Sequence, residues 1–157
     1  MRIYTDASQR KNISGIAFIV TDARDREIYK KGMVIDESDN NTAELCAILY
    51  ALDDVRYLGV KHLTILTDSW YAISAIRTGS TKIKERLIIN QIREHMSKIN
   101  GNIMWIKGHY RDGTILSYYN KRADKLSKVV RRQYEKQLRA QKRKKRQQLF
   151  ASLFKSR

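Results

Sequence analysis

Four acidic residues stand where secondary-structure elements are expected to begin or end, and they indicate what chemistry the chain can perform. They are Asp6, Glu44, Asp68 and Asp124. Asp6 and Asp68 each end a short strand-like run, and Asp68 is also expected to open a helix. Glu44 is expected to open an amphipathic helix, and Asp124 to lie on a third helix. Carboxylates gathered at strand ends and helix starts form the oxygen-rich site that hard divalent cations such as Mg²⁺ prefer.

The charge of the chain indicates what such a site would act on. The 157 residues carry a net charge of +16 and the pI is about 10.1, which favours a polyanionic partner. No segment approaches the ~20 apolar residues that a membrane-spanning helix needs, so nucleic acid is favoured over a membrane. An acidic metal site in so basic a chain indicates phosphodiester hydrolysis.

Length and cysteine content favour one domain in a reducing compartment. A chain of 157 residues with 42% hydrophobic residues suits a single sizeable core. The single cysteine, Cys46, excludes an internal disulfide and a multi-cysteine zinc site, and we expect it in the core. Residues 1–6 lack the apolar stretch of a secretory signal. We therefore expect a cytoplasmic protein.

The elements that must position the four carboxylates follow from hydrophobic periodicity. Strands are predicted near 1–8, 14–22, 27–35, 62–67 and 102–107. Helices are predicted from about Glu44 to Gly59, over 69–77 and over 84–99, and a long final helix follows a polar loop at 108–119. This order predicts an α/β protein whose five-stranded mixed sheet carries helices on both faces.

The C-terminal segment differs from the rest in composition. Residues 128–157 contain twelve Lys and Arg and one acid, Glu135, which gives +11 of the total charge and leaves about +5 elsewhere. Because the chain has no proline, this segment can continue the final helix. We therefore divide the chain into a domain at 1–132 and a basic, helical tail at 133–157.

Five short motifs, taken in order, resemble those of the type 1 ribonuclease H family. They are Tyr4-Thr5-Asp6-Ala7-Ser8, Asn40-Asn41-Thr42-Ala43-Glu44-Leu45, Leu66-Thr67-Asp68-Ser69, Lys107-Gly108-His109 and Asn120-Lys121-Arg122-Ala123-Asp124. Each motif alone is weak, whereas five in this order are specific. The resemblance covers about residues 1–130, and the expected order of elements agrees with the RNase H-like fold.

The resemblance implies a two-metal endonuclease that cuts the RNA strand of RNA/DNA hybrids and leaves 3′-hydroxyl and 5′-phosphate ends. Asp6 would bridge two Mg²⁺ ions, for which Mn²⁺ is a possible substitute. Glu44 and Asp68 would complete the ion nearer the leaving oxygen, and Asp124 would help to hold the other ion. His109 would assist proton movement or product release. Asn40 and Asn41 would contact the minor groove, where RNA displays its 2′-hydroxyls.

Four departures from the family pattern are visible, and two of them bear on substrate binding. Ala7 replaces the usual glycine, and the interval between His109 and Asp124 is longer than in familiar bacterial members. The stretch 77–94 has no room for a basic, Trp-rich protrusion, and Lys82, Lys84 and Arg86 are too few to replace it. Trp70 stands where a polar groove-contacting residue is usual, and either stacks on the substrate or packs. We therefore expect the tail to grip the hybrid, through the cluster Lys142, Arg143, Lys144, Lys145 and Arg146.

Other interpretations remain open at the level of sequence. Glu44 can complete a capping box with Asn41, Asp68 can be an N-cap, Asp6 can be a turn residue and Asp124 a solvated helix residue. For the whole chain, the alternatives are a DNA nuclease of the same fold, such as a resolvase or integrase, and a non-catalytic nucleic-acid-binding module. Fold alone does not separate these.

The end of the tail carries a different signal. Leu149, Phe150, Leu153 and Phe154 lie on one helical face directly after the basic run. This face either folds back onto the domain or docks in a partner's groove. The segment 147–154 resembles a degenerate sliding-clamp binding peptide, with Leu153 where an aromatic residue is usual. We expect a monomer, although nothing in the sequence fixes the oligomeric state.

Overall fold

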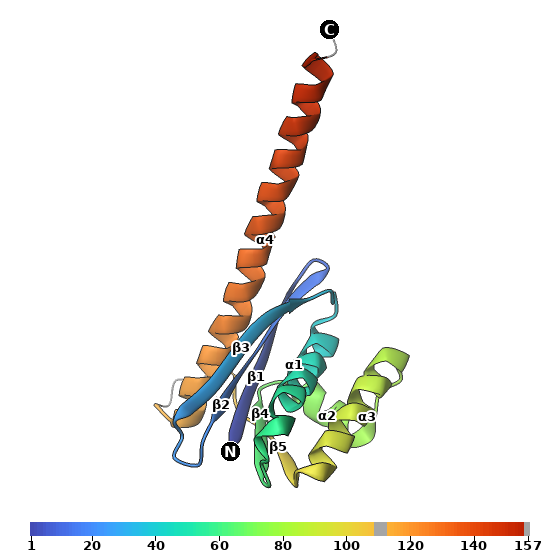
Figure 1. Ribbon diagram of the computed structural model, residues 1–157. Helices are drawn as coiled ribbons and strands as arrows, with labels where there is room; N and C mark the ends of the chain where they lie inside the picture. The colour runs from blue at the N-terminus through green and yellow to red at the C-terminus, as the bar shows by residue number, and fades with distance from the viewer. Residues whose placement is uncertain (109–112, 156–157) are drawn as a thin grey trace.

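The computed structural model describes residues 1–108 and 113–155, and the surroundings of side chains up to Phe150. The chain forms five strands and four α-helices in the order that the sequence predicts (Figure 1). In chain order these are β1 (Arg2–Arg10), β2 (Ile13–Thr21), β3 (Glu27–Ile35), α1 (Asn40–Val55), a 3₁₀ turn η1 (Arg56–Leu58), β4 (Leu63–Thr67), α2 (Trp70–Thr78), α3 (Ile83–Lys98), β5 (Gly101–Trp105) and α4 (Ile115–Lys155).

The strands form one mixed sheet in the order β3-β2-β1-β4-β5. The β1–β2 and β2–β3 pairs are antiparallel, whereas β1–β4 and β4–β5 are parallel. Helices α1, α2 and α3 cover one face and α4 crosses the other (Figure 1). The predicted five-stranded mixed sheet with helices on both faces is confirmed.

The central strands are buried on both faces, which is why they read as apolar runs rather than as alternating patterns. Ile3 packs with α1, α2 and α3, whereas its neighbour Tyr4 packs with Tyr119 and Ala123 of α4. Ile65 and Leu66 of β4 divide in the same way. Cys46 is buried in the larger core, as predicted.

The unequal lengths of β1 and β4 create the opening that matters for function. Their parallel pairing ends at Thr5 and Thr67, but β1 continues to Arg10. From Asp6 onward, the edge of β1 on the β4 side therefore has no strand beside it. Side chains from the first turns of α1 and from the end of β4 can enter this space.

The helices begin at positions that short polar caps determine. The Asp39 side chain accepts from the backbone N–H groups of Asn41 and Thr42, so α1 begins at Asn40 and Glu44 lies in its second turn. Ser69 caps α2, accepting from Ala72 at 3.2 Å. The expected start of α1 at Glu44 and the capping roles of Glu44 and Asp68 are therefore wrong.

Helix α4 also begins earlier than the sequence predicted. The Thr114 hydroxyl accepts from the Ser117 backbone N–H at 3.2 Å, and the helix starts at Ile115 rather than near residue 120. It continues without a break past residue 132 and projects beyond the sheet (Figure 1). None of the helices within the described residues is long and apolar enough to cross a membrane.

Polar contacts hold α4 in register along β1. Ser127 donates to the Asp6 carboxylate, and Arg131 Nε donates to Ser8 Oγ at 3.0 Å. Arg131 is 7% exposed and also pairs with Glu135 at 2.6 Å. Glycine makes this approach possible, because a Cβ at Gly15 would lie 2.2 Å from the backbone oxygen of Ser127.

The close approach of α4 predicts the effect of filling Gly15. We expect Gly15→Ala to lower the free energy of unfolding by about 3 kcal/mol, because backbone atoms must separate. Urea denaturation measures this change. Gly101→Ala is the matched control: its Cβ would meet Met96 Cα at 3.1 Å, and we expect a loss below about 1 kcal/mol. Equal losses would show that α4 does not depend on this contact.

Candidate metal centre

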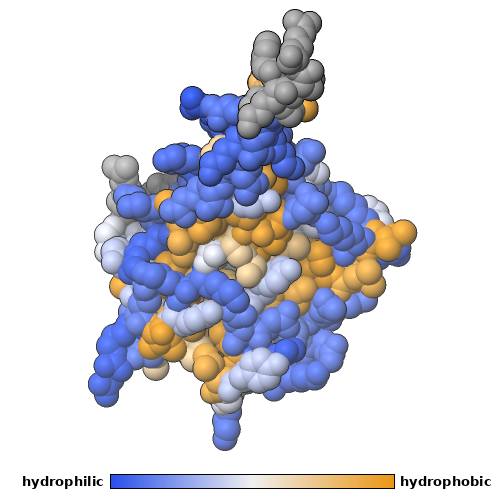
Figure 2. All heavy atoms as spheres, turned by 45° about the horizontal axis from the view of Figure 1, so that its top comes forward, coloured by the Kyte–Doolittle hydropathy of each residue, from blue (hydrophilic) through white to orange (hydrophobic). Residues whose placement is uncertain are grey.

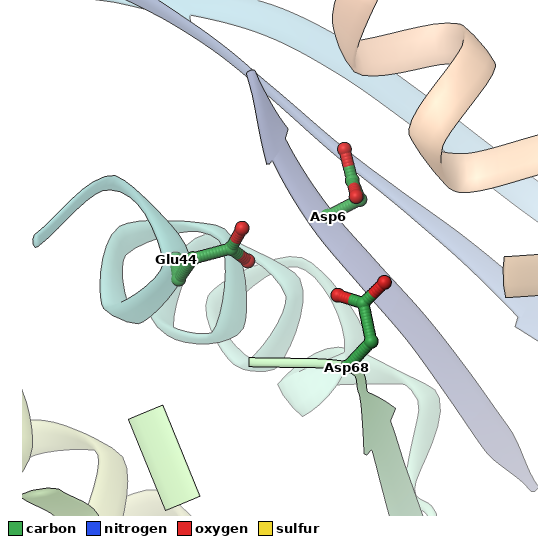
Figure 3. A group of neighbouring side chains, drawn as sticks. All are labelled: Asp6, Glu44 and Asp68. Atoms are coloured by element: carbon green, nitrogen blue, oxygen red, sulfur yellow. The ribbon is translucent and has the colours of Figure 1, made fainter. Parts of the chain in front are cut away.

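Three of the four predicted carboxylates meet at the open edge of β1. One oxygen from each of Asp6, Glu44 and Asp68 lies within 4.8 Å of the other two. Asp6 comes from β1, Glu44 from α1 and Asp68 from the turn after β4, and the three side chains point toward one another (Figure 3). The parallel pairing of β1 with β4 brings the two aspartates together, and the α1 cap turns Glu44 toward them.

Two members of the cluster are buried, Asp68 is half-buried, and the three are only partly hydrogen-bonded. Asp6 and Glu44 are each 5% exposed. Ser127 donates to Asp6, the Asn120 side-chain amide donates to Asp68 Oδ2 at 3.2 Å, and the Ala7 backbone N–H donates to Glu44. Among the described residues, Glu44 Oε2 is buried without a hydrogen-bond partner. A buried carboxylate oxygen without a partner is costly unless something else satisfies it.

Burial and mutual repulsion keep protons on this cluster. Burial raises the pKa of Asp6 to about 7; the charges of Asp124 and Asp68 add to the rise, and the hydrogen bond from Ser127 opposes it. Burial likewise raises the pKa of Glu44 well above its usual value, with Asp6 and Asp68 adding to the effect. Near neutral pH the cluster therefore favours either protons or an added positive charge.

These residues fit divalent cations. Carboxylate oxygens are the ligands that Mg²⁺ selects, and the cluster brings three carboxylates together. One of their oxygens, Glu44 Oε2, lacks a hydrogen-bond partner among the described residues. A bound cation would satisfy that oxygen and remove the repulsion that raises the pKa values of Asp6 and Glu44.

Asp124 lies beside the cluster but outside it. Its carboxylate pairs with Lys128 on the next turn of α4 at 2.5 Å. Its charge still raises the pKa values of Asp6 and Glu44, and Lys128 lowers that of Asp6. The predicted gathering of four carboxylates is therefore met by three within bonding range of one another, with the fourth held by a lysine.

The other residues predicted to act in the site are the two asparagines, Trp70 and His109. Asn40 and Asn41 are exposed on the first turn of α1. Trp70 is 65% exposed and meets Trp105 edge to face at 6.3 Å. His109 lies outside the described residues. Gly108 is described, and a Cβ there would meet Asp68 Oδ2 at 2.5 Å, so a larger residue at this position would displace the Asp68 carboxylate.

Sequence reasoning missed the residues that support the cluster. Asn120 stood inside a quoted motif without a role, and Ser127 follows Asp124 by the three residues that place both on one side of a helix. Glu85 is fully buried and accepts from Thr42 of α1 at 2.9 Å and from Tyr71 of α2. It thereby ties together the two helices that flank the opening, and no sequence signal marks it.

Burial alone would raise the pKa of Glu85, yet hydrogen bonds from Ser80, Tyr71 and Thr42, with Lys82, hold it below its usual value. Lys82 also pairs with Asp39, and Lys84 pairs with Glu37. These two cations are engaged with acids of the domain. The expectation that the 77–94 stretch offers too little charge to grip a hybrid therefore gains support.

Fold and site together define an α/β protein with an acidic, metal-type centre at the end of a parallel strand pair. The RNase H family model matches residues 1–132, and the chain belongs to that family. Ribonuclease H of Schizosaccharomyces pombe is 30% identical over 146 residues, covering 80% of this chain and 51% of the relative. The chain thus spans about half the length of that relative.

Solved structures agree with the fold. RNase H1 of the archaeon Halobacterium salinarum superimposes with a TM-score of 0.70 at 19% identity, covering 82% of this chain and 95% of the other. LC11-RNase H1, isolated from compost and solved in complex with an RNA/DNA hybrid, gives a TM-score of 0.67 at 23% identity, covering 82% and 94%. Members of this family are metal-dependent, in agreement with the acidic cluster.

The raised pKa values predict how divalent cations stabilise the protein. Asp6 binds a proton with a pKa of about 7 when folded and about 3.9 when unfolded. The folded state therefore holds more protons between these values, and the stability of the metal-free protein falls as pH rises from about 4 to 7. Added Mg²⁺ replaces those protons, so we expect it to raise Tm by several degrees at pH 8 and by much less at pH 5.

Thermal unfolding with and without 10 mM Mg²⁺ (about that concentration saturates a weak site) measures this effect. Asp6→Asn should remove most of the pH-dependent gain, whereas Glu94→Gln, an exposed acid on α3, should keep it. An equal Mg²⁺ effect at both pH values would contradict the link between the cations and these carboxylates.

Proposed function

We propose that the protein is an endonuclease that hydrolyses the RNA strand of RNA/DNA hybrids with two divalent cations, Mg²⁺ or Mn²⁺, leaving 3′-hydroxyl and 5′-phosphate ends. The observation that carries this proposal is the cluster of Asp6, Glu44 and Asp68, in which Glu44 Oε2 is buried without a partner among the described residues, in a chain of the RNase H family. The hybrid bound to LC11-RNase H1 supports the choice of substrate.

Cations in this centre would activate a water molecule and stabilise the charge on the leaving oxygen. Asp6 is suited to bridge two cations because it lies between the other carboxylates and α4, with its orientation fixed by Ser127. Glu44 and Asp68 would hold the cation on the leaving-group side. Asp124 would help to hold the cation on the water side after its carboxylate separates from Lys128.

The remaining residues position the substrate. Asn40 and Asn41 are exposed near the mouth of the centre, where amides can hydrogen-bond to 2′-hydroxyls in the minor groove. Trp70 is exposed enough to stack on a sugar or base. His109 keeps its proposed part in proton movement or product release.

The two other function classes fit the chain less well. A non-catalytic binding module has no use for three neighbouring carboxylates, which repel phosphate, or for the raised pKa values of the buried Asp6 and Glu44. A DNA nuclease of the same fold would not need the Asn40-Asn41 pair beside Glu44 or the Lys107-Gly108-His109 motif. Incubation with labelled hybrid, duplex DNA and duplex RNA in the presence of Mg²⁺ distinguishes the three classes.

Substitution of the carboxylates tests the catalytic assignment. Asp6→Asn and Asp68→Asn should each lower kcat by at least about 1000-fold, because neither amide can hold a cation as a carboxylate does. Binding of hybrid should stay equal or tighten, since a negative charge near phosphate is removed. His109→Ala should slow turnover without ending it.

Single-turnover cleavage of a labelled hybrid and fluorescence anisotropy measure the two effects separately. Glu94→Gln is the control, because it removes an equal charge from an exposed position on α3. Near-normal cleavage by Asp6→Asn would overturn the two-cation assignment.

A sliding-clamp contact through 147–154 is a second proposal for the same enzyme. Leu149 and Phe150 are 63% and 58% exposed on the projecting part of α4, which supports docking to a partner over folding back onto the domain. Calorimetric titration of residues 140–157 against the clamp of the source organism should show binding at micromolar concentration. No binding at high micromolar peptide would reject it.

We propose a monomer as the active form.

A further inference from the structure

The projecting part of α4 carries most of its cations on one side. Arg139, Lys142, Arg143 and Arg146 line a single hollow along the helix surface, whereas Lys144 and Lys145 lie on other sides. Residues 139–150 are all exposed. Between residues 136 and 150 the chain has seven Lys and Arg and no acid. Figure 2, viewed with the projecting helix forward, shows hydrophilic side chains covering it.

This cationic face joins a second basic element at the tip of the β1–β2 hairpin. Arg10 and Lys11 of the tip line one hollow together with Arg139 and Lys142 of α4. Glu135, the acid at this junction, pairs closely with Arg131 at 2.6 Å and more distantly, at 4.0 Å, with Arg10 and with Arg139. A basic track therefore runs from the hairpin tip onto the arm, which we define as residues 139–146 of α4.

The geometry fixes where the track lies relative to the carboxylates. Arg10 follows Asp6 by four residues of strand, which is about 13 Å. Arg139 and Arg146 follow Asp124 by 15 and 22 residues of one unbroken helix, which is about 23 Å and about 33 Å. Phosphates of one strand advance ~3.4 Å along the duplex axis per base pair, so a duplex lying parallel to α4 would bring phosphates about 4, 7 and 10 base pairs from the cut to these positions.

We propose that the arm is a separate duplex-binding site that contacts phosphates of the hybrid about 7–10 base pairs from the scissile bond, with the hairpin tip contacting those between. The cations favour a duplex as partner because like charges one helical turn apart repel each other, as Arg139 does Arg143 and Lys142 does Arg146. Bound phosphates would neutralise this repulsion. The inference rests on the proposed function for the identity of the duplex.

The test compares charge-matched variants in full-length protein carrying Asp6→Asn, which keeps hybrid intact during binding. Arg143→Gln/Arg146→Gln removes two cations from the arm face, and Lys144→Gln/Lys145→Gln removes two from its other sides. Lys61→Gln/Lys98→Gln removes two at the opposite end of the sheet, near the starts of β4 and β5. Glutamine is as good a helix former as lysine or arginine, so α4 persists, and circular dichroism verifies it.

Anisotropy is measured on hybrid stems of 6 and 18 base pairs, lengths chosen below and beyond the ~23 Å reach of Arg139, each closed by a loop so that the short stem stays paired. We expect Arg143→Gln/Arg146→Gln to raise Kd about tenfold on the long stem and to lower the slope of log K against log salt by about 2. On the short stem its effect should be below about twofold, as should that of Lys61→Gln/Lys98→Gln on both stems.

Three outcomes would overturn the proposal. The first is an equal loss on both stems, because the arm would then act at the cut rather than at a distance. The second is an equal loss of affinity from all three pairs of substitutions, which would show that binding depends only on the total charge of the protein. The third is no loss at all, as expected if the arm instead holds a protein. Residual cleavage by Asp6→Asn would count against the catalytic assignment alone, since the length dependence is read from binding.

Discussion

Holding three carboxylates together against their own repulsion is the constraint on which the rest of this structure depends. Asp6, Glu44 and Asp68 each place one oxygen within 4.8 Å of the other two, and burial raises the pKa values of Asp6 and Glu44. Such an arrangement persists only when stronger interactions fix the surrounding elements in place. Here those interactions are the apolar packing of both sheet faces and the parallel pairing of β1 with β4.

The supports of the cluster come from a different part of the chain than the cluster itself. Asn120 and Ser127 of α4 donate to Asp68 and Asp6, so the last helix completes a site whose ligands come from the first half of the protein. Glu85 of α3 supports the site indirectly, because it accepts hydrogen bonds from Thr42 of α1 and Tyr71 of α2, the helices on either side of the opening. The family match ends at residue 132, beyond all of these contacts.

The sequence alone predicted the order of elements, the mixed sheet and the three carboxylates that meet, because hydrophobic periodicity and ordered motifs are properties of neighbouring residues. It misplaced the starts of α1 and α4, where the caps Asp39 and Thr114 decide the boundary. It also could not foresee that Lys128 would hold Asp124 or that Glu85 would be buried, because these depend on which helix faces pack together. Long-range polar contacts leave no periodic trace in a sequence.

The end of β1 explains why the last helix leaves the body of the protein. Alternate strand residues repeat every ~6.6 Å, whereas every fourth helix residue advances ~6.0 Å and turns by about 40°. Paired positions on the strand and on the helix therefore shift slightly relative to one another with each repeat. Their contacts loosen along the series, from Ser127 with Asp6, through Arg131 with Ser8 at 3.0 Å, to Glu135 with Arg10 at 4.0 Å. The third contact falls on Arg10, where β1 ends, so beyond it the sheet offers no strand for α4 to follow and the longer helix projects past it (Figure 1).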